Sequence, residues 1–454
     1  PRTMRSTLPT FNEVWQRQLR SNVLTQAQTF TEQRSYLIGC SGGVDSMLLL
    51  HLMSFLFPQK VRAIYVDHQL QSMSSAWGDF VLNTCQQLQV PCSVVPVRVA
   101  EGNLENQARN ARYQAFTEHL QHHEVLVLAH HQQDQAETLM LRLLSGAGVQ
   151  GLSAMSTVDV RAKMILWRPL LELSREQICQ WAAQLNVQNI EDPTNADPDY
   201  DRAWCRQILW PVLQQRFPKM QQALTRTSTL MQDADEILAE VLATDLKKCG
   251  NQFLLQIESL KTLSIARQRQ LLSSWMQGEA TYRPNFAMVQ RLITEVIEAK
   301  QDAQAALHWY GFYFVRYQQQ IFRLKAEIYL AEQQNPVPTQ QHLSFRLNQS
   351  FSLASGNYCI EVQNQGLSQA LLGQTLTLSA RMGGEKIHLH GRVGSWPLKK
   401  ALQQAQIFPW LRHTIQILSI DNVMLGVFTP KGFWLAESEY LVKDGWQPKL
   451  VSGQ

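Results

Sequence analysis

The sequence lacks the cysteine patterns that mark a disulfide framework or a structural zinc site. Its seven cysteines form an odd set, and no two of them stand in a C-x-x-C pair. Small secreted domains depend on paired cysteines, and structural zinc sites need closely spaced cysteine and histidine ligands. We therefore expect free thiols and a cytoplasmic protein.

Long apolar runs are also missing. No stretch approaches the roughly 20 apolar residues that a membrane-spanning helix needs, and we find no internal repeat. Hydrophobic residues make up 45% of the chain and charged residues 17%, which is ordinary for a globular protein. We expect no membrane partner, and the length of 454 residues predicts several domains with separate cores.

The sequence has no large excess of charge of either sign, since its net charge is only +4. Basic residues are nevertheless concentrated in two segments. Residues 376–454 hold nine Lys and Arg against five Asp and Glu, and residues 200–230 hold five against one. Such surfaces favour a polyanionic partner such as nucleic acid, although a solvated protein face has the same composition.

Short apolar runs alternate with amphipathic helical stretches through the first part of the chain. This order predicts an α/β domain with a doubly wound parallel sheet over residues 15–214. Residues 215–330 predict a mostly helical domain, and the Gln- and Pro-rich residues 331–344 a linker. Residues 345–454 predict a small α+β C-terminal domain. The strands expected in the first two domains are 36–40, 61–66, 93–97, 125–129, 164–167, 312–317 and 320–324.

The most informative segment is Ser41-Gly42-Gly43-Val44-Asp45-Ser46, which follows an expected strand and opens an expected helix. The two glycines let successive backbone N–H groups face an anion, the serine hydroxyls add donors, and the helix start adds positive potential. A Walker A loop would end in Gly-Lys-Ser/Thr, and no lysine is present here. The segment therefore predicts a pyrophosphate cradle.

Asp45 is unexpected in such a cradle, because a carboxylate repels a bare polyphosphate. Its presence implies Mg²⁺ between the two groups. The structural alternative is that Asp45 caps the N-terminus of the helix.

The loop resembles the S-G-G-x-D-S motif of the N-type ATP pyrophosphatase (PP-loop) superfamily, whose members cleave ATP between its α and β phosphates to form an adenylate. Further motifs follow along the chain: Asp67 to Leu70, Glu105 to Tyr113, His130 to Thr138, Arg168 to Leu171, Asp192 to Asn195, Arg202 to Arg206, Arg381 to Glu385, Lys399-Lys400 and Pro409 to Arg412. In order and spacing these segments resemble the bacterial tRNA(Ile)-lysidine synthetase family. Two positions depart from the family pattern: Gln133 stands where an aspartate is common, and Ala203 where an asparagine is usual.

The resemblance implies an ATP-dependent carbon–nitrogen ligase whose partners are tRNA(Ile) with a CAU anticodon and free L-lysine. The C2 carbonyl oxygen of the wobble cytidine would attack the α-phosphorus of ATP, and lysine would then displace AMP to give lysidine. This change switches codon recognition from AUG to AUA. The family also includes dimers, so the resemblance allows for a homodimer.

Asp134 and Glu137 stand three residues apart at the start of an expected helix after the fourth strand. Both would face the crevice at the strand ends, where α/β sheets bind ligands, and a D-x-x-E capping box is the structural alternative. The resemblance implies Mg²⁺ at Asp45 and Asp134, and a partner for the lysine amine in Asp134 or Glu137. The two histidines before them, His130 and His131, we expect to be structural.

The expected site residues fall into two groups. The ATP cradle comprises Ser41, Gly42, Gly43, Val44, Asp45 and Ser46. The catalytic set implied by the resemblance comprises Asp45, Asp134, Glu137, Arg109, Arg112 and Arg202, of which the arginines would steady phosphates or the RNA backbone.

Two other kinds of function remain open on the residues alone. A PP-loop tRNA thiolase would need an activated cysteine and an amidotransferase a glutaminase nucleophile, yet the sequence has no C-x-x-C and no G-x-C-x-G. Cys40 adjoins the loop but is more simply the end of a buried strand. A non-catalytic tRNA-binding protein that uses ATP as a ligand would not need the three carboxylates.

Overall fold

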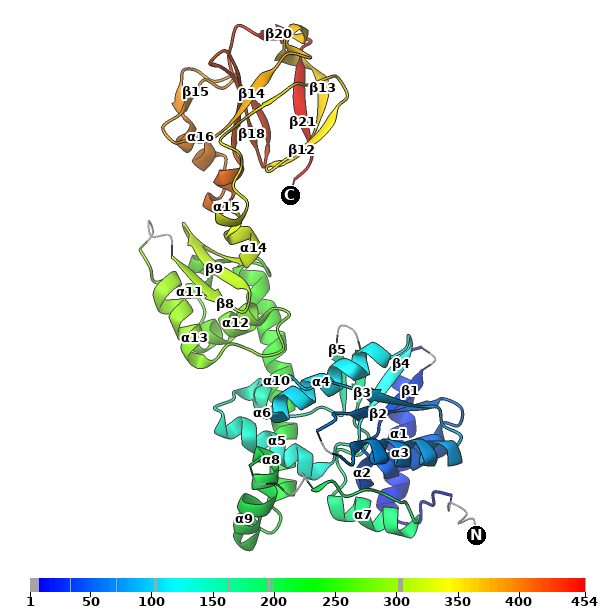
Figure 1. Cartoon of the computed structure of the whole chain (residues 1–454). Helices are drawn as coiled ribbons and strands as arrows, with labels where there is room; N and C mark the ends of the chain where they lie inside the picture. Colours follow the sequence, from blue (N-terminus) through cyan, green and yellow to red (C-terminus); the bar gives the residue numbers. More distant parts are fainter. Residues whose placement is uncertain are drawn as a thin grey trace. The chain divides into compact units, whose positions relative to one another are not determined.

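The computed structural model describes residues 8–32, 34–70, 72–101, 104–161, 164–193, 197, 199–300 and 305–453. The chain forms two compact units, Pro1–Ala239 and Glu240–Gln454, whose elements are labelled in Figure 1. Within the described ranges no helix is both long enough and apolar enough to cross a bilayer.

The first unit is built on a six-stranded sheet with the order β3-β2-β1-β4-β6-β5. Its strands are β1 Ser35–Gly39, β2 Val61–Asp67, β3 Cys92–Pro96, β4 Glu124–Val127, β5 Val158–Arg161 and β6 Met164–Trp167. All five strands expected in this domain are present and run parallel. The prediction of a purely parallel sheet is wrong at one edge, because the additional strand β5 pairs with β6 in antiparallel fashion. Their connection is too short for a parallel crossover.

Helices cover both faces of this sheet, which confirms the α/β class (Figure 1). One core joins the sheet to α1, α2, α3 and α7, and the other joins it to α4. The helices of the first part of the chain are α1 Val14–Thr29, α2 Val44–Leu56, α3 Ser74–Gln87, α4 Leu104–His119, α5 Gln132–Leu144, α6 Val149–Leu152, α7 Arg175–Gln184, α8 Asp201–Trp204, a π-helical turn Cys205–Leu209, α9 Trp210–Arg216 and α10 Met220–Cys249.

Helices make up most of residues 215–330, as expected, and pack on a four-stranded antiparallel sheet of order β7-β10-β9-β8. The strands are β7 Leu254–Gln256, β8 Ala306–Trp309, β9 Phe312–Tyr317 and β10 Gln320–Lys325; β9 and β10 are the two that the sequence predicts. The helical segments after α10 are α11 Ile257–Lys261, α12 Ile265–Gln277, α13 Phe286–Arg291, a π-helical turn Leu292–Ile297 and α14 Ala326–Tyr329.

The segment expected to be a linker, 331–344, contains α15 Ala331–Gln334 and β11 Gln340–Leu343. Strand β11 pairs with β14, so the last sheet begins inside this segment. The C-terminal domain is largely antiparallel β rather than the expected α+β, because its sheets pair in antiparallel fashion and α16, which adds Leu398 and Leu402 to one core, has only seven residues. Its remaining elements are β12 Ser350–Leu353, β13 Gly356–Leu367, β14 Leu376–Ala380, β15 Lys386–Ile387, β16 Trp396–Pro397, α16 Leu398–Gln404, β17 Gln416–Ile420, β18 Val423–Thr429, β19 Gly432–Leu435, β20 Leu441–Lys443 and β21 Trp446–Ser452.

Candidate active site

The candidate phosphate loop connects β1 to α2, as the sequence predicts. Gly42 has a φ of +90°, which residues with a Cβ rarely adopt, and a Cβ there would lie 3.0 Å from Cδ1 of Ile190. The N–H of Ile190 donates to the carbonyl oxygen of Gly42 at 2.8 Å, which joins the segment after α7 to the loop. The expected motif Asp192 to Asn195 runs on from this contact into residues 194–196, which lie outside the described residues.

The start of α2 is directed at this loop. Gly43 is the N-cap and supplies no capping side chain, so the first backbone N–H groups of α2 and the positive end of its dipole face a potential ligand. Asp45 lies inside the first turn of the helix. The alternative that Asp45 caps the helix is therefore wrong.

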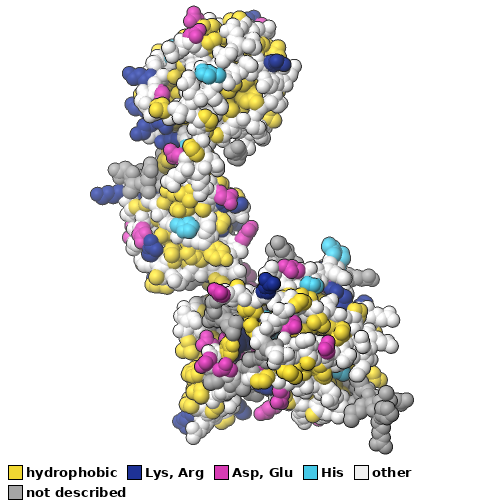
Figure 2. All heavy atoms as spheres, in the orientation of Figure 1, with side chains coloured by type: hydrophobic (Ala, Val, Ile, Leu, Met, Phe, Trp, Pro, Cys, Tyr) yellow, Lys and Arg dark blue, Asp and Glu magenta, His cyan; other side chains and the backbone are white. Residues whose placement is uncertain are grey.

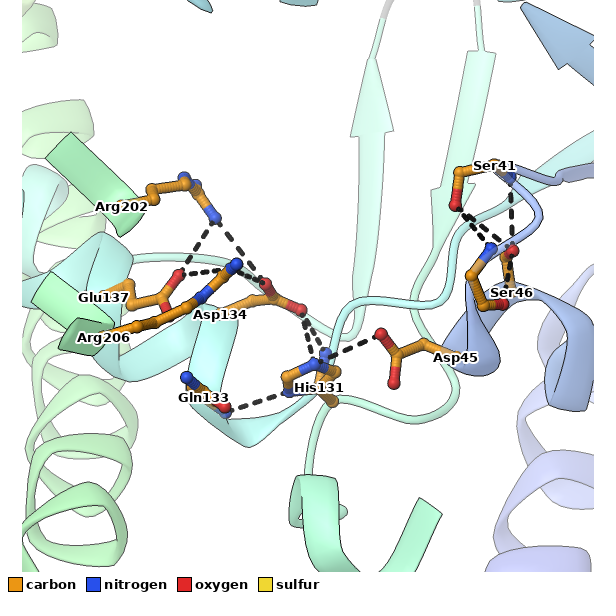
Figure 3. Close-up of polar contacts among 10 residues, drawn as sticks. Ser41, Asp45, Ser46, His131, Gln133, Asp134, Glu137, Arg202 and Arg206 are labelled. Carbon is orange, nitrogen blue, oxygen red and sulfur yellow. Dashed lines mark hydrogen bonds and ion pairs between the residues drawn. The ribbon is translucent and has the colours of Figure 1, made fainter. Parts of the chain in front are cut away.

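The two serines of the loop brace its turn. The Oγ of Ser46 accepts a hydrogen bond from the N–H of Ser41 at 3.2 Å and donates to the carbonyl oxygen of Gly43 at 3.1 Å. The two serine Oγ atoms are 3.3 Å apart (Figure 3). The N–H of Gly43 donates to Oγ of Ser41 at 3.4 Å, so the serines also occupy the N–H groups of Ser41 and Gly43. The donors that remain for an anion are the other backbone N–H groups of the loop and those at the start of α2.

A histidine lies between the two aspartates of the expected site. Nε2 of His131 is 3.6 Å from Oδ2 of Asp45 and 3.4 Å from Oδ2 of Asp134, and Figure 3 shows the two carboxylates approaching the ring from opposite sides. Burial lowers the pKa of His131, but the negative charges of Asp134 and Asp45 outweigh it and raise the pKa above its ordinary value. The structure therefore places in the site a residue that sequence analysis left outside it.

His131 also caps α5. Its Nδ1 accepts a hydrogen bond from the N–H of Gln133 at 3.2 Å, and its own N–H donates to Oδ2 of Asp134 at 3.0 Å. The capping box thus pairs His131 with Asp134, not Asp134 with Glu137 as the alternative supposed. The available sequence signal was a histidine three positions before Asp134, shortly after the buried strand β4 ends.

The two carboxylates on α5 lie in different environments. The side chain of Asp134 is 14% exposed; burial raises its pKa, but the charges of His131, His130 and Arg202 outweigh this and lower it to about 2. Glu137 is 0% exposed, and burial raises its pKa despite the opposing effect of Arg206. Asp134 is the carboxylate that a substrate can reach.

Two arginines reach these carboxylates from α8 and the π-helical turn after it. Arg206 binds Glu137 in bidentate fashion, with Nε 2.6 Å and Nη2 3.0 Å from the two carboxylate oxygens. Arg202 Nη1 lies 3.7 Å from Oδ1 of Asp134 and 3.7 Å from Oε2 of Glu137 (Figure 3). Its Nε lies 3.7 Å from Oε1 of Glu105. Arg206 was not among the expected site residues, because it lies in the π-helical turn Cys205–Leu209, which the sequence pattern does not show.

The other two expected arginines, Arg112 and Arg109, both lie on α4 but have different neighbours. Arg112 interacts electrostatically with Asp134 and Arg202, and its buried Nε has no hydrogen-bond partner among the described residues. Arg109 instead lies over the ring of Tyr113, with Cζ 5.4 Å from the ring centroid. The structure therefore brings Arg112 and Arg202 toward Asp134, whereas the contact of Arg109 is with an aromatic ring.

Comparison with known proteins identifies the family of the chain. Family models described as a PP-loop domain, a TilS substrate binding domain and a TilS substrate C-terminal domain match residues 13–213, 255–322 and 376–439. A tRNA(Ile)-lysidine synthase of Acinetobacter baylyi is 60% identical over 451 residues, covering 99% of this chain and 98% of that protein. One from Escherichia coli O157:H7 is 35% identical, covering 93% of this chain and 99% of that protein. Among solved structures, a U34-tRNA thiolase from Methanococcus maripaludis is similar over 48% of this chain and 78% of its own, with 15% identity and a TM-score of 0.40.

Proposed function

The chain belongs to the tRNA(Ile)-lysidine synthase family, and on that premise we propose that ATP lies on the loop between β1 and α2 while cytidine and lysine meet beside Asp134. It is an ATP-dependent ligase that modifies tRNA. The observation that carries the residue assignments is the cluster in Figure 3, where carboxylates from α2 and α5 and arginines from α8 and the turn after it converge next to the loop.

In the first step the C2 carbonyl oxygen of the wobble cytidine attacks the α-phosphorus of ATP, and pyrophosphate leaves. Negative charge grows on the departing pyrophosphate, where the backbone N–H groups of the loop and the start of α2 stabilise it. Arg112 and Arg202 are the side chains that we assign to the α-phosphate. The unpartnered Nε of Arg112 supports this role, because a buried donor without an acceptor is costly unless a ligand supplies one.

Asp45 has the features of a ligand for Mg²⁺. Its Oδ1 is buried and accepts no hydrogen bond from any described residue, which suits an oxygen that binds a cation. Asp134 is the second ligand that we propose, although its Oδ1 also faces Arg202 and Arg206 at 3.7 Å. No group of three potential metal ligands occurs among the described residues, and Mg²⁺ commonly takes its remaining ligands from phosphate and water. Bound there, Mg²⁺ would supply neutralisation of the triphosphate charge.

In the second step the amine of free L-lysine attacks C2 of the adenylated base, and AMP leaves. The ammonium group, with an ordinary pKa near 10.4, binds to a carboxylate that stays negative, and Asp134 with a pKa of about 2 meets that need. A carboxylate with so low a pKa is a weak base, so the ammonium releases its proton to water before the uncharged amine attacks. We assign the lysine contact to Asp134. Glu137 is fully buried behind Arg206, so we assign it the positioning of Arg206 and Arg202.

The order in which the substrates are consumed tests the proposal that adenylation of the cytidine precedes the attack by lysine. With ATP, Mg²⁺ and tRNA(Ile) bearing a CAU anticodon but no lysine, we expect pyrophosphate release and tRNA that carries AMP. Lysine added afterwards is expected to release AMP and form lysidine. Pyrophosphate release that required lysine but not tRNA would mean that lysine is the adenylated group, and the proposed order would be wrong.

The cysteine next to the loop argues against the thiolase alternative. Cys40 is 3% exposed, and burial raises the pKa of its thiol well above the usual range. A nucleophilic cysteine needs the opposite, a thiol whose pKa is lowered so that the thiolate forms.

A further inference from the structure

Side chains on α12, on the segment after it and at the start of α13 play no part in the assignments above. We call four of them, Ile265, Arg269, Tyr282 and Phe286, the ring surface; Arg269 and Phe286 are in contact. Ile265, Tyr282 and Phe286 are 68%, 74% and 69% exposed. Figure 2 shows apolar side chains at the surface of the part of the chain that contains these helices. Exposed apolar side chains that are scattered singly are ordinary, so the case for a binding site rests on what surrounds the rings.

The ring of Phe286 is held in place before any partner arrives. Cζ of Arg269 lies 5.8 Å from the centroid of the Phe286 ring. The side chain of Asn285 caps α13 by accepting a hydrogen bond from the N–H of Met288 at 2.9 Å, which fixes the helix start that carries Phe286. Arg283 donates to Oε1 of Gln270 at 3.1 Å and so joins the preceding segment to α12. A preorganised ring costs little entropy when it binds.

The charge around the ring surface is positive. Residues 264–291 contain four arginines and a single acidic residue, Glu279. Glu279 interacts electrostatically with Arg323, and two of the four arginines, Arg267 and Arg291, bind Asp245 and Glu295. Arg269 forms no ion pair within the described ranges of the chain, so its charge remains for an anionic partner.

We propose that the ring surface stacks an unpaired base of the tRNA substrate on Phe286, with Arg269 at the adjoining phosphate. An aromatic ring with an arginine over one face suits an unpaired nucleotide, because the base stacks on the other face and the guanidinium binds the backbone. An apolar protein partner would not need the unpaired arginine. The inference rests on the tRNA substrate of the proposed function, and it names the residues that bind this RNA in the second unit.

The test compares Phe286→Leu with Phe253→Leu in the full chain. Both rings are similarly exposed, 69% and 62%, and lie in the same domain, but no arginine in the described part of the chain lies over the ring of Phe253. We expect Phe286→Leu to weaken the Kd for tRNA about tenfold, the typical loss for one stacked base. Arg269→Gln is expected to weaken it and to reduce its salt dependence. Phe253→Leu should match the parent, and all variants should keep the thermal unfolding temperature and the KM for ATP.

Unchanged tRNA binding by Phe286→Leu would overturn the inference and leave the ring surface to a protein partner. Equal losses in Phe286→Leu and Phe253→Leu would also overturn it, because the effect would not depend on the arginine. Both measurements are of binding, so they are independent of turnover. A parent protein that bound tRNA but formed no lysidine would contradict the proposed function without affecting the ring surface.

Discussion

Replacing Asp45 by asparagine is expected to lower turnover about a thousandfold, a loss typical of removing one charge-stabilising group from an active site. Asparagine has nearly the same size but carries no charge, so it can neither hold a cation at the buried Oδ1 position nor attract the ring of His131. The measurement is pyrophosphate release at saturating ATP, tRNA and lysine. Binding of tRNA is expected to stay within about twofold of the parent, because the substitution alters the ATP end of the site.

Asp79→Asn is the matched control for this substitution. Asp79 is an exposed carboxylate on α3 of the same domain, and its replacement removes an equal charge without touching the cluster. We expect normal turnover from it. An Asp45→Asn protein that kept most of its turnover would contradict the role of Asp45. If the parent and both variants bound tRNA but none of the three turned over ATP, the protein would be the non-catalytic tRNA-binding alternative.

Replacing Arg206 by methionine is expected to destabilise the first unit by about 2–3 kcal/mol and to abolish most activity. The reason is that Glu137, which is 0% exposed, would be left as a buried carboxylate without its bidentate partner. The expected loss is below the roughly 3–5 kcal/mol seen for fully buried pairs, because the Arg206 side chain is 24% exposed. Calorimetry of the intact chain should show a lower unfolding temperature for the first unit.

The double variant Arg206→Met with Glu137→Gln separates stability from function. Removing the buried charge should restore most of the unfolding temperature, whereas activity should stay low because Arg206 and the orientation of Arg202 are both lost. A single variant as stable as the parent would show that the pair contributes little. A double variant no more stable than the single one would place the damage elsewhere, in the packing of Arg206 against its helix.

Much of the first unit could be predicted from the sequence because its periodic patterns are long and unambiguous. The buried strands β1 and β2 are apolar on both faces, and the helix α2 follows a loop whose Gly42 needs a positive φ. The antiparallel β5 was missed because Val158–Arg161 is a four-residue strand at the sheet edge with exposed side chains. In the second unit β7 and β8 are three and four residues long, too short for a period to be seen.

The site was predicted less completely, for a physical reason. The residues Asp45 and Asp134 could be found because each follows a strand, and the carboxyl ends of neighbouring strands meet at one edge of the sheet. Which side chains lie between them depends on rotamers and packing, so His131 was judged structural although its ring contacts both. Arg206 depends on a π-helical turn after α8, which sequence patterns do not show. Its bond to Glu137 was therefore not foreseen.

The most direct measurement is a reaction of the full chain with ATP, Mg²⁺, radiolabelled lysine and unmodified tRNA(Ile) bearing a CAU anticodon, followed by nucleoside analysis. We expect label in the wobble nucleoside, with one AMP and one pyrophosphate released for each lysine incorporated, and no label in a tRNA whose wobble position is not cytidine. Release of AMP without incorporation of lysine, by a folded protein that binds this tRNA, would contradict it.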